Sequence, residues 1–293
     1  MKVVTLLPAA TEIVTALGGS EHLVGVSHEC DYPEFIRALP RVTATPLDTR
    51  ASGVAIDAEV RRLRDSGRPV IAIDAGVLHR LAPDLIITQG LCEVCAVDAG
   101  QVHRLAAALH HVPQILSLAA LDLGGIWSDI RQVARALGLE GEADELVLGL
   151  QSRLARLRAA TRLPGEPRVL CIEWLNPLYL AGHWVPELVE AAGGRDAGAE
   201  AGARSTRWDW GELSPLRPDH IIVMLCGFGI RRARAELDSL RDLDAVRLLH
   251  RVPTWIIDGN AYTSRPGPRV VDGAARIQSA LAGREGAEVE RWR

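Results

Sequence analysis

The sequence predicts an α/β fold of two lobes, each built on a parallel sheet, joined by a long rigid helix. Short strand-like runs alternate with helical segments in both halves of the chain, which is typical of parallel sheets. Between the halves, residues 119–163 show helical periodicity and no strand. A chain of 293 residues is long enough for two lobes of about 120–130 residues each.

The two halves of the chain also resemble each other. Residues 81–90 read Leu-Ala-Pro-Asp-Leu-Ile-Ile-Thr-Gln-Gly, and residues 216–227 read Leu-Arg-Pro-Asp-His-Ile-Ile-Val-Met-Leu-Cys-Gly. Similarly, residues 11–19 and 186–194 each carry a Glu followed by an apolar residue and end in Gly-Gly. This repetition predicts two similar Rossmann-like lobes with a ligand cleft between them.

Hydrophobic periodicity places the elements of the first half. Thr11 is expected to be the N-cap of the first helix, and residues 31–56 are expected to form a long loop. Strands are predicted at 2–7, 23–27, 69–73, 85–88 and 114–118, and helices at 12–17, 56–65, 77–81 and 98–109.

Two connector helices are then predicted, the second of about 20 residues and hence roughly 30 Å long. The second half is expected to hold strands at 168–172, 221–225 and 254–258 and helices at 185–192, 233–249 and 270–281. The tail from Gly283 is expected to be frayed or only loosely docked. The predicted division is an N-terminal lobe at 1–118, connector helices at 119–163 and a C-terminal lobe at 164–293.

Composition and the lack of certain motifs argue against several classes of function. The formal net charge is −4 and the sequence has no basic cluster, so we expect no nucleic-acid partner. No apolar run is long enough for a membrane span, and the N-terminus lacks an export leader, so we expect a cytoplasmic protein. If the start were misassigned, the protein would be periplasmic. A phosphate-binding Gly-rich loop, a Gly-x-Ser-x-Gly elbow and a His-Glu-x-x-His motif are all lacking, so we expect no enzyme.

Candidate ligand-binding residues follow from the rule that ligands bind at the carboxyl ends of parallel strands. Aromatic residues make up only 4% of the chain, yet most of them lie near these predicted strand ends. The predicted ligand-binding residues are Pro8, Ala9, Thr11, Ser27, His28, Glu29, Tyr32, Gln89, Trp174, His183, Trp184, Cys226, Gly227, Phe228, Tyr262, Ser264 and Arg265.

Three cysteines and a histidine suggest an alternative function. Cys92 and Cys95 form a Cys-x-x-Cys pair, and Cys30 and His28 are predicted at the same edge of the same lobe. Together these side chains could hold zinc or an iron centre, or the cysteine pair could act in redox chemistry. The pair could equally be a reduced turn or a local disulfide, so both interpretations stay open.

Several motifs resemble a known family. The start Leu-Leu-Pro-Ala-Ala-Thr-Glu-Ile, the segment Asp-Leu-Ile-Ile-Thr-Gln and the connector helix resemble class III substrate-binding proteins of ABC transporters, the helical-backbone metal receptors. Residues 27–33, 91–97, 182–187 and 262–269 are more specifically similar to the cobalamin-binding, leaderless branch of that family. The resemblance covers essentially residues 1–282.

This resemblance implies a corrinoid such as cobalamin, or a similar large metal chelate, as the ligand. It also implies an ABC permease as a partner, or else a role as an intracellular carrier. His28 could coordinate the cobalt of a corrinoid or act as a hydrogen-bonding loop residue. Glu12 and Glu187 occupy matching positions in the two repeats. In transporter relatives such acidic residues dock on permease arginines, although a carboxylate is also favoured at a helix N-terminus.

Overall fold

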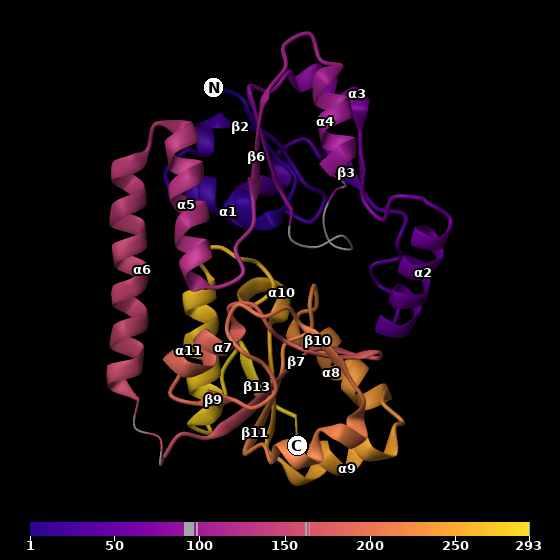
Figure 1. Ribbon diagram of the computed structural model, residues 1–293, viewed down its shortest axis with the longest axis vertical. Coiled ribbons are helices and arrows are strands. Elements are labelled where there is room, and N and C mark those ends of the chain that lie inside the picture. The colour runs from indigo at the N-terminus through magenta and orange to yellow at the C-terminus, as the bar shows by residue number, and fades with distance from the viewer. Residues whose placement is uncertain (91–96, 98, 162, 164, 293) are drawn as a thin grey trace. The chain divides into compact units, whose positions relative to one another are not determined.

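The computed structural model describes residues 1–90, 97, 99–161, 163 and 165–292. The chain forms two compact units. Unit 1 contains residues 1–51, 55–120 and 124–148, and unit 2 contains residues 52–54, 121–123 and 149–293. Each unit has its own β-sheet covered by helices (Figure 1). The predicted α/β fold of two lobes with parallel sheets is confirmed.

The main sheet of unit 1 is entirely parallel. Its strand order is β2-β1-β5-β6, and every neighbouring pair runs in the same direction. The central strands are buried along almost their whole length, as expected where a parallel sheet is covered on both faces. The four strands are β1 (Val3–Thr5), β2 (Leu23–Val26), β5 (Leu85–Gln89) and β6 (Gln114–Leu118).

Two expectations for unit 1 were wrong in detail. The first helix begins at Pro8 rather than after Thr11, because proline suits the first helical turn, where its missing N–H costs nothing. Thr11 is therefore a buried residue inside this helix. The expected loop at 31–56 contains a 3₁₀ helix, a strand paired antiparallel with β4, and the start of the next helix. The elements are α1 (Pro8–Ala16), η1 (Ser20–His22), η2 (Glu34–Ala38), β3 (Thr43–Ala44), α2 (Gly53–Asp65), β4 (Ala72–Ile73), α3 (Ala75–Leu81) and α4 (Ala99–Ala107).

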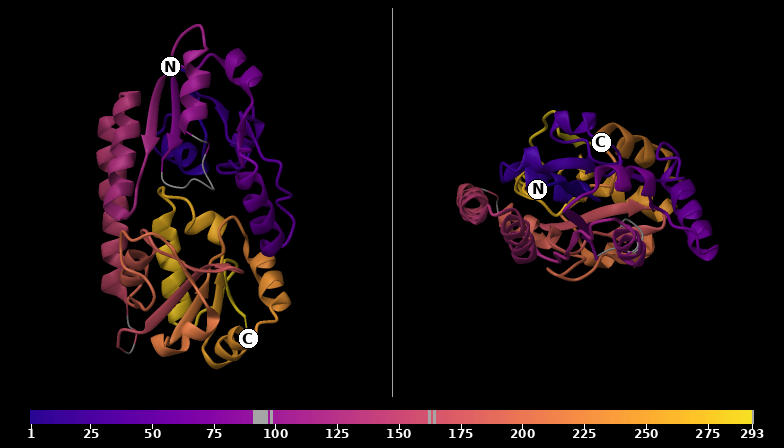
Figure 2. Two further views of the ribbon diagram at one scale, coloured as in Figure 1. Left: turned by 45° about the vertical axis from the view of Figure 1, so that its right-hand side comes forward. Right: turned by 90° about the horizontal axis from the view of Figure 1, so that it is seen from above.

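Two connector helices follow β6, as predicted. They are α5 (Leu123–Leu137) and α6 (Glu140–Ala160), and α6 has 21 residues. Figure 2 shows α5 and the first part of α6 side by side, and the Arg131 Nε lies 3.2 Å from the Asp144 Oδ1 between them. The boundary between the units falls inside α6, between Leu148 and Gly149. The division of the chain at 118 and 163 stays a prediction.

The sheet of unit 2 has a parallel centre and antiparallel additions. Strands β9, β7, β11 and β12 are parallel neighbours, whereas β8, β10 and β13 run antiparallel to their partners. The sequence predicted only the three central strands of this set. The seven strands are β7 (Arg168–Leu175), β8 (Leu178–Leu180), β9 (Arg195–Asp196), β10 (Thr206–Trp208), β11 (His220–Val223), β12 (Thr254–Ile257) and β13 (Val289–Arg291).

The helices of unit 2 include one predicted helix that is divided and three short ones, η3, η4 and α10, that were not predicted. The single helix expected at 233–249 is two helices, because the Asp242 carboxylate accepts a hydrogen bond from the Ala245 N–H and starts a new helix. The helices are α7 (Val185–Ala191), η3 (Trp210–Glu212), η4 (Ser214–Leu216), α8 (Ile230–Ser239), α9 (Leu243–Arg251), α10 (Gly259–Tyr262) and α11 (Val270–Leu281).

The C-terminal tail is ordered, so the expectation of a frayed tail was wrong. Strand β13 pairs with β12, and the Trp292 side chain is buried. The Trp292 Nε1–H donates to the Asp238 Oδ1 at 2.9 Å, which ties the tail to α8. Among the residues that the structure describes, no helix has the length and apolar character needed to cross a membrane.

Candidate functional site

In unit 1, polar side chains cluster where β1 and β2 end. The Thr5 and Thr11 hydroxyl oxygens are 2.6 Å apart, and the Thr11 Oγ1 lies 3.1 Å from the Cys30 Sγ. All three side chains are buried. The structure thus brings Thr11, predicted as a ligand-binding residue, and Cys30, predicted as a metal ligand, together in the interior.

His28 is held by hydrogen bonds to the Thr43 side chain. The Thr43 hydroxyl lies 2.7 Å from the His28 Nδ1 and accepts the His28 backbone N–H at 3.0 Å. The same hydroxyl donates to the Ser27 Oγ at 3.1 Å. Burial, and secondarily the Arg41 guanidinium, lower the pKa of His28. Because the Thr43 hydroxyl gives its proton to Ser27, the Nδ1–H of a neutral His28 donates to Thr43 and the Nε2 is left to accept a hydrogen bond from a ligand.

The connection after β2 is fixed by Arg41. Its guanidinium donates to the backbone carbonyls of Ser27 and Cys30 at 3.1 and 2.8 Å. The Glu29 N–H donates to the Ser27 Oγ at 3.3 Å. These bonds order the segment that carries His28, Glu29 and Cys30. Sequence reasoning missed Thr43 and Arg41 because both lie in the segment taken for a loop.

The remaining predicted residues of unit 1 surround this cluster. Pro8 and Ala9 form the first turn of α1, and Gln89 is the last residue of β5. The Tyr32 side chain is 46% exposed. Cys92 and Cys95 lie outside the described residues. Within the described part of the chain, no three His, Cys, Asp or Glu side chains come close enough to share a metal ion, so the Cys/His metal site stays a prediction.

In unit 2, an aromatic group lies where β7 and β11 end. The Trp174 and Phe228 rings pack edge to face with their centroids 5.3 Å apart. The Arg232 guanidinium carbon lies 3.5 Å from the centroid of the Phe228 ring, a cation–π contact. Trp174 is half-buried, so part of its ring remains accessible. Sequence reasoning found both rings but missed Arg232.

Cys226 and Gly227 shape the turn that precedes Phe228. The Cys226 N–H donates to the Glu173 carbonyl at 3.0 Å, which ties the turn to β7. Gly227 has a φ of +74°, a backbone conformation that favours glycine. The Cys226 side chain is half-buried.

Trp184 is a structural anchor. The Trp184 side chain is buried, and its Nε1–H donates to the Thr263 carbonyl at 2.9 Å. This bond attaches the segment 262–265 to the start of α7. Ser264 is half-buried in this segment, and the buried Arg265 guanidinium donates to the Asn260 Oδ1 at 3.0 Å.

Tyr262 belongs to a network of charged groups. Its hydroxyl donates to the Glu288 carboxylate, which also pairs with Arg276, and the Arg276 guanidinium carbon lies 4.4 Å from the Tyr262 ring centroid. Burial, together with the bond to Glu288, raises the pKa of Tyr262 to about 12. This network holds the ring of Tyr262 and the C-terminal segment together.

His183 has an unusual backbone conformation. Its φ is +57°, in the left-handed region that non-glycine residues seldom occupy. Its backbone N–H donates to the Ala203 carbonyl, and its carbonyl accepts the Gly202 N–H at 2.9 Å. Burial, and secondarily Arg204, lower the pKa of His183. Strain of this kind concentrates at functional sites, which agrees with the choice of His183 as a candidate.

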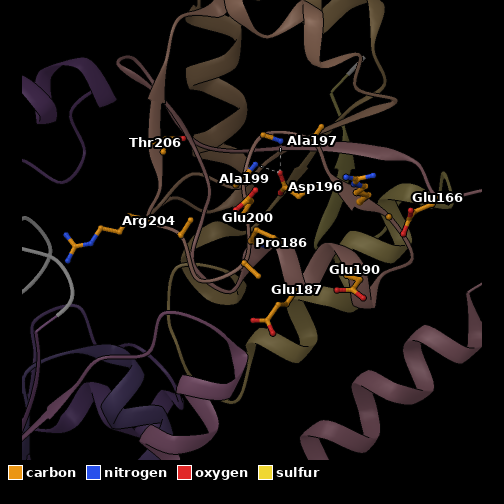
Figure 3. Close-up of a pocket in the computed structure, with 15 residues that line it drawn as sticks. Glu166, Pro186, Glu187, Glu190, Asp196, Ala197, Ala199, Glu200, Arg204 and Thr206 are labelled. Carbon is orange, nitrogen blue, oxygen red and sulfur yellow. Dashed lines mark hydrogen bonds between the residues drawn. The ribbon is translucent and has the colours of Figure 1, made fainter.

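A pocket of about 770 Å³ lies elsewhere in unit 2, between α7 and the segment 194–206 (Figure 3). Glu187 and Glu190 reach it from α7, whereas Arg204 points away from the other labelled side chains. Asp196 accepts the Gly198 and Ala199 N–H groups at 2.9 Å each, and burial raises its pKa to about 6. None of the predicted ligand-binding residues is among the residues that line this pocket.

Two α/β units connected through a long helix define the class III fold of solute-binding proteins. The profile of the periplasmic binding protein family, Peripla_BP_2, matches residues 3–250, and the chain belongs to this family. Proteins of this family bind solutes and are not enzymes, in agreement with the sequence prediction. A search of curated protein sequences gives no match.

Similar solved structures support the fold. A periplasmic haem-binding protein from Pseudomonas aeruginosa superposes with a TM-score of 0.73 at 20% identity, covering 99% of this chain and 97% of that chain. Haem-binding RhuT from Roseiflexus sp. RS-1 gives 0.69 at 23% identity, covering 96% and 98%. The vitamin B12-binding BtuF of Vibrio cholerae gives 0.62 at 20% identity, covering 96% of each chain.

Proposed function

We propose that this protein binds a corrinoid of the cobalamin type, or a similar large metal chelate, as the substrate-binding component of an ABC transporter or as a carrier. The observation that carries the proposal is the pair of packed aromatic rings in unit 2, Trp174 and Phe228. Trp174 and Phe228 offer ring surface at the carboxyl ends of β7 and β11. Burying the apolar face of a flat macrocycle against such rings would supply much of the binding free energy.

In each unit taken by itself, charged and hydrogen-bonding groups support the same ligand class. Arg232 lies on the Phe228 ring and would favour a ligand with acidic or amide side groups. In unit 1, the neutral His28 would act as a hydrogen-bonding group at the ligand, and its lowered pKa keeps it uncharged at neutral pH. An apolar surface with a few fixed polar groups is the usual composition of a small-molecule site.

The similar structures support a metal-bearing ligand. Two of the similar structures are described as haem-binding proteins and one as a vitamin B12-binding protein. Haem and corrinoids are both large ring systems around a metal. These relatives are less than 25% identical to this chain, so they support a ligand class and leave the choice within it to experiment.

The direct test is titration of the purified protein with cobalamin, cobinamide and haemin, followed by absorbance and by calorimetry. The proposal predicts saturable binding of at least one of them at one molecule per chain, with a Kd below tens of micromolar, about −6 kcal/mol. If none of the three ligands binds in this range, the proposal is wrong.

Variants locate the site. Trp174→Leu should weaken the binding of the successful ligand by about 1 kcal/mol or more, because it removes the accessible ring surface. Trp208→Phe is the matched control, since Trp208 bonds to Thr206 on β10 and is not part of the aromatic group. Equal affinities of the two variants would exclude the aromatic group as the binding surface.

Partner and location are further parts of the proposal. A permease partner would make the protein an importer component, whereas a cytoplasmic protein would act as a carrier or a store. Fractionation of the native host with an antibody against this chain distinguishes the two roles. We keep the cytoplasmic location as the prediction to be tested.

A further inference from the structure

Two histidines meet on the surface of unit 1, outside every candidate residue described above. His79 lies in the last turn of α3, and His110 lies in the turn that follows α4. Their ring centroids are 5.2 Å apart and their planes are inclined by 69°. Both residues are exposed, so solvent and dissolved ions can reach them. Figure 1 shows α3 and α4 next to each other in this part of unit 1.

This separation is compatible with a shared metal ion. A zinc–imidazole nitrogen bond is about 2.0–2.1 Å long, and the ring centre lies about 1 Å further from the metal. Two imidazoles at a tetrahedral angle on one ion therefore have centroids about 5 Å apart. We propose that His79 and His110 form a two-histidine surface site for a divalent transition-metal ion such as Zn²⁺, Ni²⁺ or Cu²⁺.

The two histidines are positioned by a common core. Leu78, next to His79, and Ala106, in the last turns of α4, are buried members of one hydrophobic cluster. Leu109, next to His110, packs against the same cluster. Because α3 and α4 pack on the same core, the two rings are held near each other before any ion binds, which reduces the entropy lost on chelation.

Local backbone bonds fix the ends of both helices. The Asp74 carboxylate accepts the Val77 N–H at 2.9 Å and starts α3. The Leu109 N–H donates to the Ala106 carbonyl at 3.2 Å and defines the turn that carries His110. The one cationic neighbour on α3, Arg80, places its guanidinium beside Gly76, one turn back along the helix.

The ligand set selects the class of ion. Imidazole nitrogen is a preferred ligand for zinc, copper and nickel, and a poor one for calcium and magnesium. No group of three metal-binding side chains occurs in the described part of the chain, so water would complete the coordination shell. The site is independent of the corrinoid or chelate proposed above, because none of the residues assigned to that ligand takes part.

Titration with Zn²⁺ alone tests the proposal. The experiment is done in a Cys92→Ser/Cys95→Ser background, so that the cysteines cannot supply the binding. Calorimetry should show one saturable site per chain, and the imidazole proton signals of His79 and His110 should shift together in NMR spectra. His79→Gln and His110→Gln should each weaken Zn²⁺ binding at least about tenfold.

His22→Gln is the matched control, and it should leave the Zn²⁺ affinity unchanged. Circular dichroism of each variant confirms that it is folded. Saturable binding that survives both His79→Gln and His110→Gln would overturn the proposal. So would the lack of saturable binding at millimolar Zn²⁺. If Zn²⁺ does not bind at His79 and His110, the proposal of a corrinoid or chelate ligand is not affected. If no corrinoid or haemin binds, the proposal of a zinc site is not affected.

Discussion

The Glu187 carboxylate accepts a hydrogen bond from the Leu123 backbone N–H at 2.6 Å. Leu123 is the first residue of α5, so Glu187 caps a helix that it does not belong to. Burial raises the pKa of Glu187. Glu12, its counterpart in the other repeat, is buried in α1. The hydrogen bond to Leu123 therefore gives Glu187 a structural role at the start of α5.

Glu187→Ala should lower the free energy of unfolding by about 1–2 kcal/mol, because the N–H at the start of α5 loses its charged partner. Denaturant unfolding followed by circular dichroism measures the change. Glu190→Ala is the control, since Glu190 pairs with Arg158 at an exposed position where a salt bridge contributes little. A docking residue without a structural role would leave the stability of the Glu187 variant equal to that of the control.

Asp129→Asn should change how stability depends on pH. Asp129 accepts the Ala119 and Ala120 N–H groups at 3.2 and 3.1 Å, and burial raises its pKa from 3.8 to about 6. A raised carboxyl pKa means that the protonated form stabilises the fold. This contribution is complete below pH 3.8 and is lost as the pH rises through about 6.

The wild-type protein should lose about 3 kcal/mol of its free energy of unfolding when Asp129 is fully deprotonated. The asparagine variant does not titrate, so its stability relative to wild type should rise between pH 4 and pH 7. Urea unfolding of both proteins across that range gives the difference. A difference that is constant with pH would contradict the raised pKa of Asp129.

His28→Ala should weaken binding of the corrinoid or chelate by about 1 kcal/mol, the usual contribution of one hydrogen bond, without altering the absorption spectrum of the bound ligand. The reason is that Thr43 engages the Nδ1 of His28, which agrees with a hydrogen-bonding role for the ring. Absorbance spectra of the bound variant and wild type test this. A changed spectrum would show instead that His28 coordinates the metal.

Trp292→Ala should destabilise the protein by about 3 kcal/mol, as expected for removal of a buried tryptophan. Trp292 is buried and bonded to Asp238, so its loss would also free β13 from β12. Thermal unfolding measures the effect, and Arg284→Ala serves as the control, since Arg284 is exposed and its backbone bond to Ser279 is kept in the variant. An unchanged melting temperature for the tryptophan variant would restore the interpretation of a frayed tail.

The sequence predicted the parallel strands and the long helices well. Strand β6 and helix α11 have the predicted bounds, because continuous apolar runs and regular helical spacing are strong local signals. Short elements escaped prediction. Strands β3 and β9 have two residues each, and such strands are fixed by the partner they pair with rather than by their own composition.

The candidate site residues stay a prediction, and the contacts that their side chains make could be predicted only in part. Strand ends could be located from the sequence, which identified His28, Trp174 and Phe228. The partners Thr43 and Arg232 could not be found, because they reach these residues through the packing of other elements. The burial of Thr11 and Cys30 followed from the start of α1 at Pro8, which spacing alone did not reveal.

The position of the unit boundary within α6 limits how this protein can be dissected. A cut between Leu148 and Gly149 would interrupt the continuous helix α6 next to Val147 and Leu150, whose side chains are both buried in the intact protein. Neither half can be excised cleanly for separate expression. Truncation studies should therefore keep all 21 residues of α6 in whichever piece is produced.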